Sequence, residues 1–103
     1  MRIGYSQLNN TVGDLEGNLS LGIDAYEQLC GQGVDLVVFP ELFLCGYPPR
    51  DLLYKENFLA DTERVLQEFA RQTGPTPALI GYAEKDLKPA SFRKCFNSAA
   101  WCV

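Results

Sequence analysis

Histidine is absent from this sequence of 103 residues. Its absence excludes Ser-His-Asp and Cys-His catalysis as well as histidine-ligated metal sites. Basic residues are scarce, with nine Lys and Arg against 13 Asp and Glu, and the formal net charge is -4. A chain this acidic lacks the electrostatic footprint of a nucleic-acid-binding protein, and we do not expect it to adhere to anionic membranes.

Long apolar runs are also lacking. No window approaches the roughly 20 apolar residues that span a bilayer, and no apolar stretch of signal-peptide length follows Met1. None of the four cysteines is spaced as C-x-x-C, so we expect no metal site and four free, buried thiols: Cys30, Cys45, Cys95 and Cys102. These features predict a cytoplasmic protein in a reducing compartment.

The residues that are present follow a globular pattern of alternating strand and helix signals, with 47% hydrophobic and 21% charged residues. Asp14 and Asn57 are the predicted helix N-caps. The predicted order is a strand at 2–8, a helix at 15–30, a strand at 34–39, a helix at 57–73, a strand at 78–83, a polar turn at 85–91 and a strand at 95–103. This alternation predicts an α/β fold with helices on one face of the sheet, and we expect the last two strands to be antiparallel.

The apolar strand at 34–39 and the last strand are both predicted to be buried. A nearly continuous apolar strand is typical of a sheet covered on both faces, and Trp101 on the last strand is predicted to lie in the core. The sequence ends inside that last strand, and native domains rarely stop there, because the strand edge would be left unpaired. We therefore expect residues 1–103 to be the N-terminal part of one domain in a longer polypeptide.

Glu41 is the candidate catalytic residue. It comes directly after Pro40 and the apolar strand at 34–39, and ligands of open α/β sheets bind beyond the carboxyl ends of the strands. A carboxylate held there is well placed to act as a general base. We expect its side chain to be sequestered from solvent and directed into a cavity near Tyr47. The alternative is an exposed acidic loop residue with no role in catalysis.

Three motifs around Glu41 resemble a known family. They are Phe39-Pro40-Glu41-Leu42, Gly46-Tyr47-Pro48-Pro49 and Asp51-Leu52-Leu53, and they are accompanied by Ile3-Gly4-Tyr5-Ser6-Gln7-Leu8-Asn9 and Asn97-Ser98-Ala99-Ala100. The strand followed by Pro-Glu and Gly-Tyr resembles the nitrilase superfamily of carbon-nitrogen hydrolases. The longer Tyr-Pro-Pro motif narrows the resemblance to the glutaminase domains of glutamine-dependent NAD synthetases. The fold implied is a nitrilase-like α-β-β-α sandwich, of which this chain would form a partial layer.

The resemblance also implies roles for individual residues. The superfamily uses a Glu, a Lys and a Cys and needs no histidine. Glu41 matches the glutamate that serves as general base, and Tyr47 matches a tyrosine that lines the glutamine pocket. The matching lysine and nucleophilic cysteine would lie beyond Val103, so neither Cys95 nor Cys102 is given a catalytic role.

The reaction implied is the hydrolysis of glutamine to supply ammonia for the ATP-dependent amidation of nicotinic acid adenine dinucleotide to NAD. The ATP and Mg²⁺ would bind a synthetase domain outside these residues, so no cofactor is expected in this segment. The implied partners are glutamine, the rest of the polypeptide and further copies of the enzyme in a homo-oligomer. Two alternatives remain open: a stand-alone amidase of the nitrilase superfamily, and a truncated domain without catalytic activity.

Overall fold

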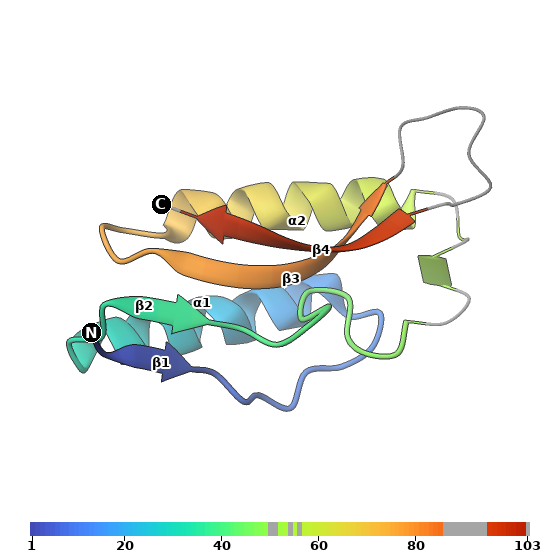
Figure 1. Cartoon of the computed structure of the whole chain (residues 1–103). Coiled ribbons are helices and arrows are strands. Elements are labelled where there is room, and N and C mark those ends of the chain that lie inside the picture. Colours follow the sequence, from blue (N-terminus) through green and yellow to red (C-terminus); the bar gives the residue numbers. More distant parts are fainter. Residues whose placement is uncertain (50–51, 54, 56, 86–94, 103) are drawn as a thin grey trace.

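Six secondary-structure elements alternate along the chain in the predicted order (Figure 1). The computed structural model describes residues 1–49, 52–53, 55, 57–85 and 95–102. The elements are β1 (Ile3–Tyr5), α1 (Leu15–Gly31), β2 (Leu36–Val38), α2 (Phe58–Gln72), β3 (Ala78–Lys85) and β4 (Cys95–Cys102). The first two strands are shorter than predicted. The turn expected at 85–91 lies outside the described residues except for Lys85, which belongs to β3.

The four strands form one sheet in the order β1-β2-β3-β4. The first three strands are parallel, and β4 pairs antiparallel with β3, which confirms the predicted pairing of the last two strands. The register aligns one residue from each strand in a continuous row across the sheet: Tyr5, Val38, Leu79 and Trp101. Because side chains alternate between the two faces of a strand, this row lies on a single face.

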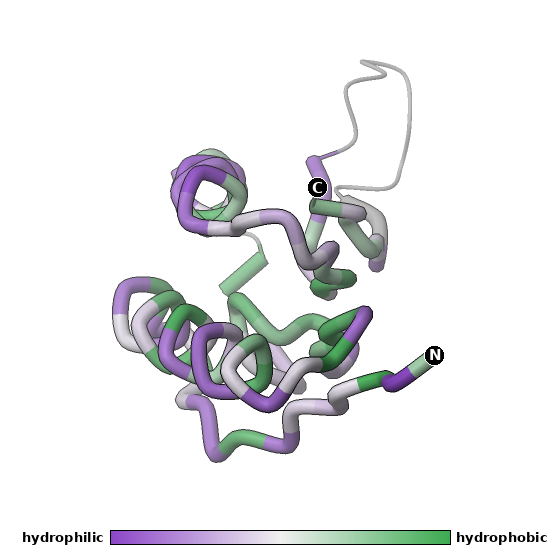
Figure 2. The backbone as a smooth tube through the Cα atoms, turned by 90° about the vertical axis from the view of Figure 1, so that its left-hand side faces the viewer, coloured by the Kyte–Doolittle hydropathy of each residue, from purple (hydrophilic) through white to green (hydrophobic). Residues whose placement is uncertain are grey.

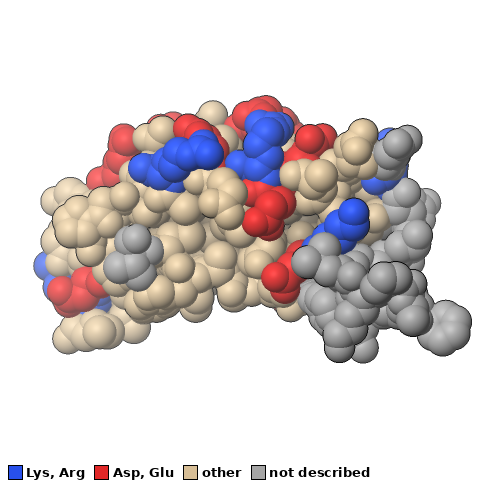
Figure 3. Space-filling model, turned by 90° about the horizontal axis from the view of Figure 1, so that it is seen from above, with Lys and Arg blue, Asp and Glu red and all other residues tan. Residues whose placement is uncertain are grey.

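Both helices cover the opposite face of the sheet, as predicted (Figure 2). Apolar residues at three- and four-residue spacings turn toward the strands and form the core. Phe69 of α2 lies at its centre, with edge-to-face contacts to Tyr26 of α1 and to Phe39 after β2. Charged side chains of both signs gather on the outer side of α2 (Figure 3), where Arg64 pairs with Glu16 and Arg71 with Glu68. The two helices thus form one layer with a buried apolar side and a solvated charged side.

The two helices begin in different ways. The Asp14 side chain accepts a hydrogen bond of 3.0 Å from the backbone N–H of Gly17, which confirms it as the N-cap of α1. Asn57 precedes α2 in a left-handed conformation with φ of 68°, and its side chain makes no capping hydrogen bond. The predicted N-cap position of Asn57 is therefore confirmed, and its backbone carbonyl oxygen accepts from the N–H of Asp61 at 2.8 Å, but no side-chain cap forms. The residue instead supplies a left-handed turn into the helix, a conformation that asparagine tolerates better than most residues.

The face of the sheet away from the helices is open in the described part of the chain. Ile3, Tyr5 and Trp101 are 58%, 54% and 59% exposed, so the prediction of a core position for Trp101 is wrong. In β2 only Val37 is fully buried, whereas Leu36 and Val38 are partly exposed, so the expectation of a strand covered on both faces also fails. The apolar pattern was correct, but the described residues supply a covering layer for one face of the sheet and not for the other. Among the described residues, no helix is long and apolar enough to cross a membrane.

Candidate active site

Glu41 lies in a turn that leaves the sheet at the carboxyl end of β2. The backbone N–H of Phe39 still donates to the carbonyl oxygen of Leu79 on β3, at 2.9 Å, so the chain follows the sheet for one residue beyond β2. Pro40 has no N–H with which to continue this ladder. The turn over residues 41–45 then begins with Glu41. The sequence therefore fixes where the sheet ends and where the carboxylate emerges.

Gly81 of β3 has no side chain, and this allows the turn to pack directly against the backbone of β3. A Cβ atom at Gly81 would lie 2.5 Å from the backbone nitrogen of Leu42 and 2.7 Å from the carbonyl oxygen of Pro40. Separations below about 3 Å are not tolerated between such atoms, so only glycine allows the turn to approach β3 this closely. The backbone on both sides of Glu41 is thus in direct contact with the central part of the sheet.

Asn18 of α1 holds the other end of the turn by hydrogen bonds from its side chain. Its side chain is 1% exposed. Its Nδ2 donates to the carbonyl oxygens of Leu44 and Thr11, both at 2.8 Å, and its Oδ1 accepts from the N–H of Thr11 at 2.9 Å. Nearby, Asn10 Nδ2 donates to the carbonyl oxygen of Phe43 at 2.6 Å. This role of Asn18 was not predicted from sequence. A polar residue within the apolar stripe of a helix is nevertheless a recognisable signal of a buried, hydrogen-bonded side chain.

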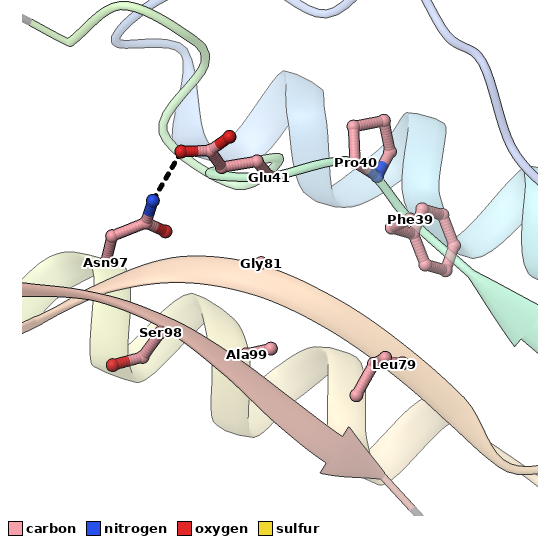
Figure 4. A pocket seen from close by; sticks show the side chains of 8 residues that line it. All are labelled: Phe39, Pro40, Glu41, Leu79, Gly81, Asn97, Ser98 and Ala99. Carbon is pink, nitrogen blue, oxygen red and sulfur yellow. Dashed lines mark hydrogen bonds between the residues drawn. The ribbon is translucent and has the colours of Figure 1, made fainter.

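A cavity of about 250 Å³ opens beside Glu41 on the uncovered face of the sheet (Figure 4). Three segments line it: the residues directly after β2, the first half of β3 and the middle of β4. From β4, the Asn97 side chain points at Glu41, and its Nδ2 donates a short hydrogen bond to Glu41 Oε1. The lining residues are Phe39, Pro40, Glu41, Leu79, Gly81, Asn97, Ser98 and Ala99.

The two residues predicted for the site are placed differently. Glu41 lines the cavity, but its side chain is exposed rather than sequestered, because the cavity lies on the face of the sheet that these residues leave open. Tyr47 is 66% exposed and is not among the residues that line this cavity. The structure therefore brings together Glu41 and Asn97, a pairing that the sequence analysis did not predict.

Cysteine thiols and acidic side chains are the other groups that could react or bind a metal ion. Cys102 is buried, and burial raises the pKa of its thiol, so the thiolate form needed for nucleophilic attack is disfavoured. Cys45 is buried within the turn that follows Glu41. In the described ranges, no group of three or more His, Cys, Asp or Glu side chains could hold a metal ion. Glu41 is therefore the reactive group that the cavity offers.

Comparison with known families assigns the chain to a class of enzymes. The sequence profile of the carbon-nitrogen hydrolase family matches residues 2–102. The match covers nearly the whole sequence, and the chain belongs to this family. The strand that precedes Pro40-Glu41 and the helix-covered sheet are thus parts of a carbon-nitrogen hydrolase fold.

Its curated relatives are more specific. The chain is 46% identical over 103 residues to a glutamine-dependent NAD(+) synthetase of Thermotoga maritima, an alignment that covers 97% of this chain and 17% of the relative. It is 40% identical over 78 residues to the enzyme of the same name from Synechocystis, covering 76% of this chain and 14% of the relative. The resemblance predicted from the motifs is confirmed. The chain spans about a sixth of the length of these relatives.

Solved structures confirm the nitrilase-like fold. The structure of a glutamine-dependent NAD(+) synthetase from Cytophaga hutchinsonii superposes with a TM-score of 0.86 at 23% identity, covering 98% of this chain and 17% of that one. An amidase from Nesterenkonia superposes with a TM-score of 0.76 at 25% identity, covering 98% of this chain and 37% of that one. Another structure of an amidase from this genus belongs to the nitrilase superfamily.

Proposed function

We propose that these residues form the glutamate-bearing part of a glutaminase site in a glutamine-dependent NAD synthetase. One observation carries the proposal: Glu41 lies at the carboxyl end of a parallel strand and lines a cavity on the sheet. The similarity to synthetases of that name supports the choice of glutamine as the substrate. In this proposal residues 1–103 are the first part of the glutaminase domain.

The proposed reaction is the hydrolysis of the side-chain amide of glutamine. Glu41 accepts the proton of a cysteine thiol supplied by a later part of the polypeptide, and the resulting thiolate attacks the amide carbonyl carbon. The C–N bond breaks as the protonated Glu41 returns its proton to the nitrogen, which leaves as ammonia, and the acyl group stays on sulfur as a thioester. Water then attacks the thioester while Glu41 accepts its proton, which releases glutamate and restores the thiol.

Other parts of the proposal involve residues outside this chain. The catalytic lysine and cysteine, and a synthetase domain that amidates nicotinic acid adenine dinucleotide, would follow Val103. No glycine-rich phosphate loop occurs in the 103 residues, so ATP and Mg²⁺ find no binding residues here. Tyr47 is proposed to contact glutamine, and its exposed phenol is available to a ligand. The complete enzyme is proposed to be a homo-oligomer.

A stand-alone amidase is the second candidate function. The superposition on the Nesterenkonia amidase supports it, because the same fold occurs there in an amidase. The two candidates differ in the rest of the polypeptide, where a synthetase domain is either present or absent. They also differ in substrate, since an amidase of this kind would act on amides other than glutamine. A third possibility, a domain without activity, applies to the 103 residues taken alone, because the lysine and the nucleophile would both be missing.

The experiment that tests the proposal is Glu41→Gln in the complete enzyme. Glutamine has nearly the same shape as glutamate but cannot accept the thiol proton, so glutamine-dependent NAD formation is expected to fall by about 10²- to 10⁴-fold. NAD formation from free ammonia is expected to be unchanged, because ammonia bypasses the glutaminase site. Both rates are measured at saturating ATP and dinucleotide.

Glu84→Gln is the matched control. Glu84 is also an exposed carboxylate on the sheet, and it accepts hydrogen bonds from Ser98 and Tyr82, but it does not line the cavity beside Glu41. Both activities are expected to stay at the wild-type level in this variant. An equal loss of glutamine-dependent and ammonia-dependent activity in Glu41→Gln would contradict the assignment of Glu41 as the base.

A further inference from the structure

Asn97 and Glu41 are brought together across the width of a strand. Glu41 follows β2, Asn97 lies on β4, and β3 separates these two strands in the sheet. Asn97 pairs with Ala83 of β3, and Ala99 pairs with Gly81. The side chain of Asn97 therefore reaches Glu41 across a part of β3 where the residues are small (Figure 4). Gly81 also allows the turn that bears Glu41 to approach β3 closely.

Because side chains alternate between the two faces of a strand, Asn97 and its neighbour Ser98 on β4 point to opposite faces of the sheet. The hydroxyl of Ser98 donates to Glu84 Oε1 at 3.0 Å, and Glu84 also accepts from the hydroxyl of Tyr82. Asn97, in contrast, points to the uncovered face and donates to Glu41. Two carboxylates near β4 are thus hydrogen-bonded by two adjacent residues, but only Glu41 faces the cavity.

The chemistry of the amide suits it to orient a base. The NH₂ group of asparagine donates hydrogen bonds but does not ionise near neutral pH, so it cannot take the proton that the base must accept. The bond engages Oε1 of Glu41 and leaves Oε2 to receive a proton. Proton transfer requires the acceptor oxygen within hydrogen-bond reach of the donor, and a misplacement of about 1 Å can cost about 100-fold in rate.

We propose that Asn97 is a positioning residue for glutamine hydrolysis: its side-chain amide holds the Glu41 carboxylate in the orientation that accepts the thiol proton. This inference rests on the proposed role of Glu41 as the base. It assigns Asn97 no contact with glutamine and no proton of its own to transfer. A purely structural tie between β4 and the turn is the competing explanation of the same hydrogen bond.

The two explanations differ in what Asn97→Ala changes in the complete enzyme. The positioning role predicts that kcat for glutamine hydrolysis falls by about 100-fold while KM for glutamine stays within about threefold. The melting temperature and the ammonia-dependent rate are expected to stay at their wild-type values, because the bond is exposed to solvent in this structure. A structural tie predicts the reverse, a lower melting temperature with an unaltered kcat in the molecules that remain folded.

Asn97→Asp supplies a readout that a structural tie would not move. The introduced carboxyl is an acceptor when ionised and a donor when protonated, and two adjacent carboxyl groups share a proton more readily as the pH falls. The ratio of the kcat of Asn97→Asp to that of Asn97→Ala is therefore expected to rise between about pH 8 and about pH 5. Taking the ratio cancels any general acid inactivation that the two variants share.

The outcomes separate this inference from the proposed function. If Glu41→Gln keeps wild-type glutamine hydrolysis, the proposed function fails, and the inference fails with it. If Glu41→Gln abolishes hydrolysis but Asn97→Ala keeps a wild-type kcat, or if the pH ratio is flat, only the inference is overturned. Glu84→Gln is the matched control, and it is expected to retain the wild-type kcat and the wild-type pH profile.

Discussion

At the residue scale, Gly81 decides where the catalytic candidate lies. Gly81→Ala is expected to push the turn at residues 40–42 away from β3, because the added Cβ would lie 2.5 Å from the nitrogen of Leu42. The expected result is a loss of glutamine-dependent activity of about 100-fold in the complete enzyme. The free energy of unfolding is expected to fall by about 1–3 kcal/mol. Steady-state kinetics and chemical unfolding measure the two effects.

Gly31→Ala is the matched control for this substitution. A Cβ atom at Gly31 would have open space around it, and the residue is the last of α1, outside the turn that carries Glu41. Alanine is also the better helix former, so stability is expected to be unchanged or slightly higher. If both variants kept full activity, the close approach at Gly81 would have no part in placing Glu41.

The residue scale also shows what the sequence could not predict. The position of Glu41 after an apolar strand, the cap at Asp14 and the helix predicted at 57–73 all follow from local patterns, and all are seen in the structure. The contact between Asn97 and Glu41 joins residues 56 positions apart. It depends on the strand order and on a glycine in the intervening strand, and no local pattern contains that information.

At the scale of elements, the starts of the two helices are opposite cases. Asp14 caps α1 with its side chain, whereas Asn57 enters α2 through a left-handed turn without a side-chain bond. Asp14→Ser is expected to leave the free energy of unfolding unchanged, since serine is an equally good cap. Asn57→Ser is expected to lower it by on the order of 1 kcal/mol, because serine tolerates positive φ less well than asparagine.

Chemical unfolding followed by circular dichroism measures both changes. Asp14→Ala serves as the positive control, with an expected loss of about 1 kcal/mol for the missing cap. An unchanged stability in Asn57→Ser would show that the left-handed entry into α2 is not required. The N-cap position of Asn57 follows from the sequence, but the missing side-chain bond does not: asparagine is favoured both as a side-chain cap and at positive φ, and the sequence alone does not distinguish the two.

At the scale of the whole molecule, the two faces of the sheet are unequal. One face is covered by α1 and α2, and the other exposes Ile3, Tyr5 and Trp101. The core position predicted for Trp101 is wrong for this reason. Hydrophobic periodicity shows which residues prefer burial, but it does not show whether the chain supplies a layer that covers them. Apolar surface left exposed on this scale favours association with other molecules.

The 103-residue chain expressed alone is therefore expected to bind a hydrophobic fluorescent dye and to form oligomers. Trp101→Thr removes the largest exposed side chain of this face while keeping a residue that suits a strand, and both properties are expected to weaken. Leu21→Gln is the control, since Leu21 is exposed on α1, away from the sheet. Dye fluorescence and light scattering measure the outcome, and equal effects of the two substitutions would contradict it.

The hydrogen bond between Asn97 and Glu41 also has a consequence for protein synthesis. Asn97 is the 56th residue that the ribosome adds after Glu41. At about 5–20 residues per second, the nascent acidic group waits roughly 3–11 seconds for its amide partner, and it stays unanchored until the final hairpin has emerged and paired. Translation order therefore makes the orientation of this carboxylate one of the last features that these residues acquire.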